Sequence, residues 1–307
     1  MTGGSRSWLE TSRGAFSALF WEAAPGSPSR LPLVFSHATG FNAQTYAPLL
    51  GPLAGERPLV AVDARGHGLT DLPADPGALS DWEPYVDDLQ AVVAALGGRA
   101  HLAGHSLGAV VGLRLAARWP AGVASVTLLE PVMPSPLVCA LLRGAVAVGL
   151  RERLPLVEQA RRRRARFESR EAMVRAYTGR GAFTTWPAPW IEAYVAGGAV
   201  DDAEGGVALA CAPAWEAATF AATPYDSWAA LAALQVPVAI LYGGRSTTFS
   251  RRSERAALRR QPGALVERID RATHFLPMER PDEARGQMKI QWTRGGDSPG
   301  QPPPSGG

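Results

Sequence analysis

Short apolar runs alternate along the chain with longer stretches in which apolar residues recur every three or four positions. Near-continuous apolar runs are typical of parallel strands that are covered on both faces. We predict such strands at 31–36, 58–62, 101–103, 123–129, 236–241 and 264–269, with 16–21 as an antiparallel edge strand. The clearest helices are predicted at 81–96, with Ser80 as N-cap, and at 107–119, before Pro120. Strands that alternate with helices indicate an α/β fold with a mainly parallel sheet.

The alternation stops after Glu130 and resumes at 236. The intervening residues, to about 228, show helical stretches but no convincing strand. We therefore predict a helical cap at 136–228, inserted into a core formed by 1–135 and 229–294. The last segment, 295–307, contains no apolar residue that could anchor it and is expected to be disordered.

Composition narrows the class of protein. The 307 residues are 46% hydrophobic and 19% charged, with a net charge of +3. This is ordinary globular composition, and so small a charge excess does not indicate nucleic-acid binding. The two cysteines, Cys139 and Cys211, form no metal-binding pattern and are expected to be free thiols. Without a recognisable signal peptide or a long apolar span, we expect a cytoplasmic monomer or homodimer with no membrane or nucleic-acid partner.

The pattern Gly-x-Ser-x-Gly at 104–108 carries the candidate chemistry. It directly follows a predicted strand and directly precedes a predicted helix. A serine hydroxyl is a weak nucleophile, and a sharp strand-to-helix turn exposes it beside a helix N-terminus. Glycines are needed on either side because a Cβ would crowd that turn. We predict Ser106 as the nucleophile and the Leu107 backbone N–H as an oxyanion donor.

Three further segments accompany this motif: HATGF at 37–41, DARGHG at 63–68 and ATHFLPMERP at 272–281. Together with GHSLG they resemble the α/β-hydrolase superfamily over nearly the whole chain, to about residue 290. The resemblance implies an eight-stranded sheet with helices on both faces, a cap between strands six and seven, and a Ser-acid-His triad. The chain departs from the usual pattern at Ala38, where the family commonly has glycine.

The general base follows from the order of the residues. The superfamily order is nucleophile, acid, histidine, and of five histidines only His274 comes after Ser106. A lone histidine is more often structural, but this order favours His274 as the base. It follows a predicted strand, in a loop expected at the carboxyl edge of the sheet.

The acid is less well defined. Its usual place is the loop after the strand 236–241, but residues 242–249 include no carboxylate, and Glu254 falls inside a predicted helix. Glu130 ends the strand 123–129 at the same edge, and we predict it as the acid that orients the base. Haloalkane dehalogenases, a branch of the superfamily, can place the acid there, although Ser106 argues against dehalogenase chemistry. Asp270 remains the alternative, only four residues from the histidine.

A second oxyanion donor is expected from the loop after the strand 31–36. Its small, glycine-containing sequence lets a backbone N–H approach the substrate, and we predict that of Thr39. The predicted substrate pocket comprises Ala38, Phe41, His105, Val132 and Phe275.

Two features of the insertion bear on the substrate. The basic run Arg161–Arg164 is interpreted as a solvated helix face, because consecutive helical residues point in different directions. Aromatic residues are frequent in the insertion and favour a lipophilic substrate: Phe167, Tyr177, Phe183, Trp186, Trp190, Tyr194, Trp215, Phe220, Tyr225 and Trp228.

These residues predict a serine hydrolase that cleaves carboxylic esters of small to medium, lipophilic substrates through an acyl-enzyme. No metal or organic cofactor is required by that mechanism. Hydrolysis of a C–C bond, an amide or a lactone uses the same triad and stays open. A hydrolase-fold binding protein without turnover is the alternative from another class. The missing loop aspartate favours it, and the presence of Ser106 and His274 disfavours it.

Overall fold

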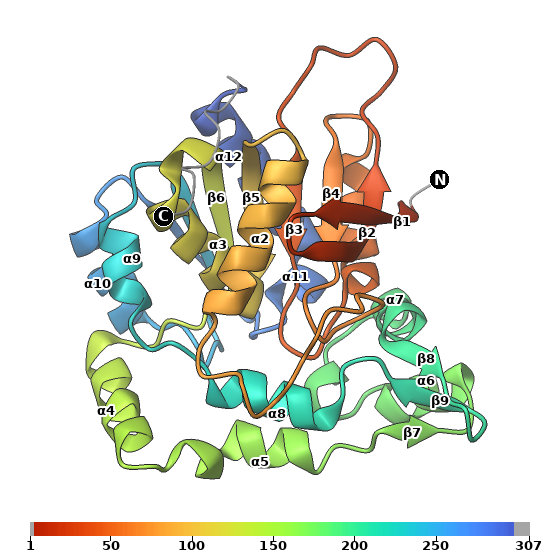
Figure 1. Cartoon of the computed structure of the whole chain (residues 1–307). Coiled ribbons are helices and arrows are strands. Elements are labelled where there is room, and N and C mark those ends of the chain that lie inside the picture. The colour runs from red at the N-terminus through yellow and green to blue at the C-terminus, as the bar shows by residue number, and fades with distance from the viewer. Residues whose placement is uncertain (1–2, 298–307) are drawn as a thin grey trace.

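An eight-stranded sheet forms the centre of the computed structural model, which describes residues 3–297 (Figure 1). The strand order is β1-β2-β4-β3-β5-β6-β10-β11. From β4 to β11 neighbouring strands are parallel, whereas β2 is antiparallel to both β1 and β4. The strands are β1 (Ser5–Thr11), β2 (Gly14–Trp21), β3 (Leu33–Ser36), β4 (Leu59–Val62), β5 (Ala100–His105), β6 (Val123–Leu129), β10 (Val238–Gly243) and β11 (Leu265–Ile269). The predicted α/β fold with an eight-stranded, mainly parallel sheet is confirmed.

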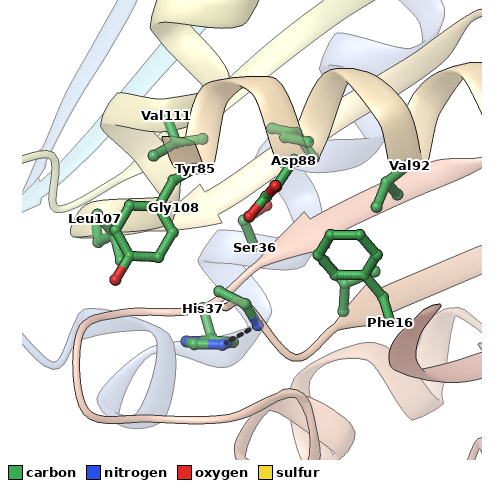
Figure 2. A pocket seen from close by; sticks show the side chains of 12 residues that line it. Phe16, Ser36, His37, Tyr85, Asp88, Val92, Leu107, Gly108 and Val111 are labelled. Atoms are coloured by element: carbon green, nitrogen blue, oxygen red, sulfur yellow. Dashed lines mark hydrogen bonds between the residues drawn. The ribbon is translucent and has the colours of Figure 1, made fainter. Parts of the chain in front are cut away.

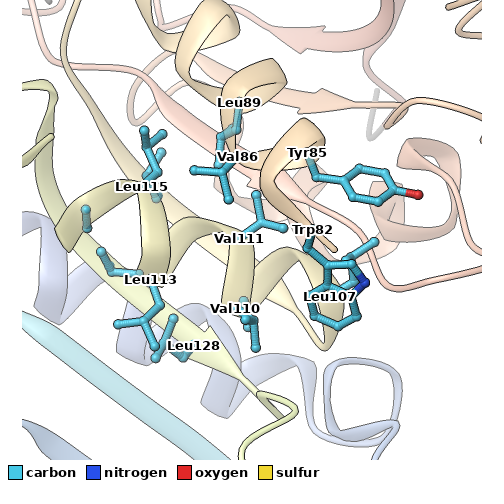
Figure 3. Packing of buried hydrophobic residues seen from close by; sticks show 14 of the residues in the cluster. Trp82, Tyr85, Val86, Leu89, Leu107, Val110, Val111, Leu113, Leu115 and Leu128 are labelled. Atoms are coloured by element: carbon cyan, nitrogen blue, oxygen red, sulfur yellow. The ribbon is translucent and has the colours of Figure 1, made fainter. Parts of the chain in front are cut away.

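Helices cover both faces of this sheet, and each face has its own apolar core. Successive residues of a strand point to opposite faces, so Leu102 and Leu128 join one core while Ala103 and Leu129 join the other. The first core contains side chains from α2 (Glu83–Ala95), α3 (Leu107–Arg118), α9 (Ser227–Ala232) and α10 (Arg251–Arg260). Figure 3 shows α2 and α3 interdigitating through this cluster. The second core contains residues of α1 (Ala47–Leu50), α11 (Leu276–Glu279) and α12 (Pro281–Gly295).

The insertion between β6 and β10 lies along one end of the sheet (Figure 1). Its α-helices before α9 are α4 (Pro136–Ala147), α5 (Pro155–Arg161), α6 (Arg170–Tyr177), α7 (Ala188–Gly198) and α8 (Pro213–Ala221). Several of its aromatic residues belong to the second core, together with Phe35 and Phe41 of the sheet domain: Phe183, Trp186, Trp190 and Tyr194. The insertion and the sheet domain therefore share apolar packing.

Three local expectations were wrong. Strand β2 is not at the edge, because β1 pairs outside it. The insertion contains a small sheet of β7 (Arg166–Phe167), β9 (Val207–Leu209) and β8 (Ala199–Asp201), whose strands are too short to show an alternating pattern. Helix α2 begins at Glu83 with Trp82 at the N-cap, rather than after Ser80, and it has proline in its first turn.

The C-terminal part of the described chain is anchored. Helix α12 extends to Gly295, and the Asp297 carboxylate accepts hydrogen bonds from Leu31 N (3.2 Å) and from the Arg57 guanidinium (3.1 Å). The rest of the segment expected to be disordered, 298–307, lies outside the described residues. Between residues 3 and 297, no helix is both long and apolar enough to cross a membrane.

Candidate active site

Ser106 occupies the turn between β5 and α3. Its backbone has φ 55° and ψ −110°, which directs the chain from the strand into the helix. A Cβ on Gly104 would lie 2.4 Å from Gly108 C, and a Cβ on Gly108 would lie 2.1 Å from Ser36 O. Neither distance is possible for a real side chain, so the tight turn requires both glycines. The Ser106 N–H donates to Leu129 O (3.0 Å), which fixes Ser106, the predicted nucleophile, beside the end of β6.

Backbone strain is concentrated at this site. Among the described residues, only three non-glycine residues have positive φ: Ser106 (55°), Glu130 (50°) and Arg271 (65°). The first two are the predicted nucleophile and acid, and the third lies three residues before the predicted base. Such conformations cost free energy and persist where the surrounding structure holds them, which is common at functional sites.

The structure brings Ser106, His274 and Glu130 together. Ser106 Oγ lies 3.0 Å from His274 Nε2, within hydrogen-bonding distance. The other ring nitrogen, Nδ1, lies 3.5 Å from Glu130 Oε2. Since Nε2 must be free to take the serine proton, Nδ1 carries the ring proton and faces the carboxylate. The three side chains follow the order of a Ser-acid-His triad, with the carboxylate slightly beyond direct hydrogen-bonding distance of the ring.

The Glu130 side chain is fully buried and held by several donors. Gly243 N donates to Oε1, and Ser246 Oγ donates to Oε2 at 2.5 Å. Thr248 Oγ1 lies 3.4 Å from Oε2 and only 3.0 Å from His274 Nδ1, so this hydroxyl stands beside both groups. Sequence reasoning missed the two hydroxyls because it searched the loop after β10 for carboxylates alone.

Asp270, the alternative acid, lies elsewhere. Its side chain is 76% exposed and forms an ion pair with Arg268. Among the described residues it has no hydrogen bond or ion pair with His274. The geometry therefore favours Glu130 over Asp270 as the partner of the base.

A buried hydrogen-bond chain connects the base to the predicted oxyanion loop. His105 Nε2–H donates to His274 O (2.7 Å), and the Tyr46 hydroxyl donates to His105 Nδ1 (2.6 Å). The same hydroxyl accepts from Ala38 N (3.2 Å). Burial holds the pKa of His105 well below its ordinary value, which keeps the ring neutral with one proton to donate. No sequence pattern distinguishes Tyr46, which lies in a short helical segment.

Some backbone N–H groups near Ser106 donate a hydrogen bond within the protein, and others do not. Ala38 N donates to Tyr46 and Gly40 N donates to His67 Nε2 (3.0 Å). Among the described residues, the N–H groups of Thr39 and Leu107 have no hydrogen-bond acceptor. Leu107 begins α3, where helix geometry leaves its N–H free. Both predicted oxyanion donors are thus without an acceptor in the described part of the chain, and their role stays a prediction.

Two neutral histidines support the oxyanion loop. His37 Nε2 accepts from Ala64 N (2.9 Å) while its Nδ1–H donates to Ala38 O, and His67 accepts from Gly40 N. Burial lowers the pKa of His37 to about 4 and that of His67 to about 3. His37 also borders a small cavity of about 30 Å³ behind α3, lined by Phe16, Tyr85, Leu107 and others (Figure 2). Ser106 does not line this cavity, which belongs to the core.

We expect the stability of the protein to fall as pH falls from about 6.5 to 4. An unfolded histidine takes up a proton near its ordinary pKa of 6.5, whereas folded His37 and His67 do so only near 4 and 3. The unfolded state binds more protons in this window, so each ring lowers the free energy of unfolding by about 1.4 kcal/mol per pH unit. Above pH 7 both states are neutral and the effect vanishes.

Urea unfolding at pH 7, 6, 5 and 4.5 measures this dependence. Carboxylates also contribute in acid, so the matched variant is His67→Gln, whose amide oxygen can still accept from Gly40 N–H. Between pH 6 and 5, unfolding of this variant should take up about one proton fewer than unfolding of the wild type. Its unfolding free energy should therefore depend less steeply on pH. Equal slopes in the two proteins would contradict the assignment.

Aromatic side chains form a cluster beside His274. Phe41 from the oxyanion loop stacks on Phe275, the neighbour of His274, with ring centroids 6.3 Å apart. Trp186 of the insertion contacts both rings, at 5.2 Å and 5.7 Å. Two predicted pocket residues, Phe41 and Phe275, therefore line one apolar surface with the insertion.

The other predicted pocket residues lie differently. His105 and Ala38 are buried in the hydrogen-bond chain to the base, and Val132 is half-buried against the first core. The geometry gives His105 a positioning role, and its contact with substrate stays a prediction.

A buried ion pair lies above the oxyanion loop. Helix α5 ends at Arg161, so the basic run is not a continuous helix face, and Arg163 turns inward. Its guanidinium donates to both Glu216 oxygens (3.0 and 2.9 Å) and to the Tyr194 hydroxyl. The Glu216 carboxylate packs so closely on Gly40 that a Cβ there would lie 2.3 Å from Oε1. The interpretation of the run as fully solvated was wrong for Arg163.

Comparison with known proteins identifies the family of the chain. The sequence model of the Alpha/beta hydrolase family matches residues 33–285. The chain is 36% identical over 99 residues to 2-(acetamidomethylene)succinate hydrolase of Mesorhizobium japonicum, covering 32% of this chain and 34% of that protein. It is 40% identical over 101 residues to a putative carbamate hydrolase of Variovorax paradoxus, covering 32% and 37%. The matched region thus spans about a third of the length of these curated relatives.

The fold extends much further than these local matches. The crystal structure of E-2-(acetamidomethylene)succinate hydrolase superimposes with a TM-score of 0.75 at 23% identity, over 95% of this chain and 98% of the other. At that identity the likeness describes the fold alone. The family match covers most of the chain, from β3 to α12, and includes every predicted triad residue. The chain belongs to the alpha/beta hydrolase family.

Proposed function

We propose that this hydrolase cleaves carboxylic esters of small to medium, lipophilic substrates through an acyl-enzyme on Ser106. The 3.0 Å contact between Ser106 Oγ and His274 Nε2 is the observation that carries the proposal. A serine that is strained into a strand-to-helix turn beside a histidine is the arrangement that activates an alcohol nucleophile.

In the first half of the reaction, His274 Nε2 takes the hydroxyl proton as Ser106 Oγ attacks the ester carbonyl carbon. The N–H groups of Leu107 and Thr39 stabilise the negative oxygen of the tetrahedral intermediate. His274 then gives its proton to the departing alcohol oxygen, and the C–O bond of the ester breaks. Glu130 stabilises the transient imidazolium from the Nδ1 side.

In the second half, His274 takes a proton from water and the resulting hydroxide attacks the acyl carbon. The intermediate collapses, Ser106 Oγ leaves and recovers the proton from His274, and the free acid departs. The same two N–H groups stabilise both intermediates.

The aromatic side chains beside His274 support a lipophilic substrate. Phe275 contacts the His274 ring and packs with the buried rings of Phe41 and Trp186. Arg163 is neutralised by Glu216, so this pair adds no net charge that would attract an anion. A substrate with a long apolar acyl or alcohol part would bury surface against these rings.

A series of p-nitrophenyl esters from acetate to decanoate tests the proposal. We expect kcat/KM to rise with acyl length up to a medium chain, because each buried methylene contributes about 0.8 kcal/mol, roughly fourfold. The succinyl ester, matched in size but charged, should be a poorer substrate. Folded protein that hydrolyses none of these esters would refute the proposal.

The names of the relatives supply a second candidate. Two relatives are named as a hydrolase of 2-(acetamidomethylene)succinate and as a putative carbamate hydrolase. The same triad attacks acyl carbons bound to nitrogen. Comparing p-nitrophenyl butyrate with the matching p-nitroanilide distinguishes the two, since a C–N hydrolase should cleave both at comparable rates.

A further inference from the structure

Exposed apolar side chains are concentrated in one short region of the insertion. Of eleven large hydrophobic residues that are exposed among the described residues, six lie between positions 137 and 156. Five of them, which we call the α4 patch, lie on helix α4 and the turn after it: Leu137, Val138, Leu141, Val148 and Leu150. Scattered exposed hydrophobic residues are normal, but a group of this kind marks a surface for interaction.

The patch has the spacing of one helix face. Leu137, Leu141 and Val148 are separated by four and seven positions, which align along a helix, and they are 68%, 66% and 72% exposed. Cys139, on another face, is the buried residue of α4, and its thiol donates to Pro134 O. The helix is thus attached at its beginning, and its leucines are exposed. It lies at the edge of the molecule (Figure 1).

The exposed charges beside the patch are positive. Farther along the insertion, Arg162, Arg163 and Arg166 are ion-paired with carboxylates and add little to them. Arg143 and Arg153, on either side of the turn at Leu150, are exposed. Helix α4 itself carries no carboxylate. Apolar side chains flanked by arginines are complementary to an anionic lipid surface, where the chain carbons enter the acyl layer and the guanidinium groups meet the headgroups.

We propose that helix α4 docks this hydrolase onto the surface of anionic lipid bilayers. Docking here means lying in the interface, because α4 has only twelve residues and cannot span a membrane. A second copy of the chain fits less well, since symmetric pairing of α4 would bring arginines together with no carboxylate on the helix to offset them. The proposal differs from the sequence-based expectation of no membrane partner, and it does not depend on the esterase activity.

Flotation with vesicles of phosphatidylcholine and phosphatidylglycerol in a two-to-one ratio tests the proposal. The wild-type chain should float with these vesicles and much less with phosphatidylcholine alone. Salt at about 0.5 M should weaken the binding, because the Debye length then falls below about 5 Å.

Two variants separate the apolar and charged contributions. Leu137→Ser with Leu141→Ser and Val148→Ser should lower the bound fraction at limiting lipid at least about tenfold. Arg143→Gln with Arg153→Gln should weaken binding to the anionic vesicles by roughly 25-fold and remove most of the salt dependence. The matched control is Ile290→Ser, on helix α12, which exposes a similar apolar side chain and should bind as wild type.

Several outcomes would overturn the proposal. Wild-type protein that stays with the lipid-free fraction, or a serine variant that floats equally well, excludes docking through α4. If light scattering shows a dimer that the serine variant dissociates, and no vesicle binding is seen, a second copy covers the patch instead. Circular dichroism shows whether each variant folds. If the serine variant does not fold, vesicle binding of the arginine variant tests the proposal.

Discussion

Replacement of Ser106 by alanine should lower kcat by about 10⁶-fold, because acyl transfer then loses its nucleophile and the base loses its function with it. Residual turnover should reflect only substrate binding and the oxyanion donors. The fold should survive, since Ser106 Oγ has a hydrogen bond only with His274 among the described residues, and the turn is held by the backbone and by Gly104 and Gly108. Alanine must adopt the same positive φ, which the wild-type serine already does.

A fluorophosphonate probe measures this prediction independently of the substrate. The probe should label the wild-type protein covalently, and mass spectrometry should place the adduct on the peptide that contains Ser106. Ser29→Ala, at an exposed loop serine, serves as the control and should label as wild type. Folded wild-type protein that resists labelling would favour a hydrolase-fold binding protein without turnover.

The parts of the fold that could be predicted are those with strong local patterns. Strands β3 to β6 are mostly apolar because both faces of the sheet are buried, so runs of apolar residues in the sequence indicated where they lie. The turn that holds Ser106 was also visible in the sequence, because its packing requires two glycines. A Cβ on either glycine would lie only 2.1 to 2.4 Å from neighbouring backbone atoms. Strand β1 was not visible, since it is largely exposed and mixes serine, arginine and glutamate.

The supporting residues of the site could not be predicted because they act across long distances in the chain. Tyr46 reaches His105, and Thr248 reaches His274, through ordinary hydroxyl groups that no local pattern distinguishes. Arg163 was hidden in a run of identical neighbours, and only the end of α5 at Arg161 decides which of them turns inward. Tertiary structure selects among residues that look equivalent in the sequence.

Replacement of Glu130, the predicted triad acid, by glutamine should lower kcat by about 10³- to 10⁴-fold and leave the fold intact. Glutamine is similar in size, its amide oxygen can still accept from Gly243 N, and its N–H can donate to Ser246 Oγ, which then accepts. It carries no charge, so the imidazolium that forms on His274 is no longer stabilised. If the amide N–H faces Nδ1, it also favours the tautomer whose proton sits on Nε2, where the base must be free.

The same measurement decides between three candidate partners of the base. Thr248 Oγ1 lies nearer to His274 Nδ1 than Glu130 does, at 3.0 against 3.5 Å, but a neutral hydroxyl cannot balance an imidazolium. Thr248→Val should therefore cost only about tenfold, the worth of one neutral hydrogen bond. Asp270→Asn should be nearly silent, because that carboxylate is exposed and paired with Arg268. A severe loss in Thr248→Val with a mild one in Glu130→Gln would show that the hydroxyl orients the base and that the buried carboxylate only holds the loop after β10.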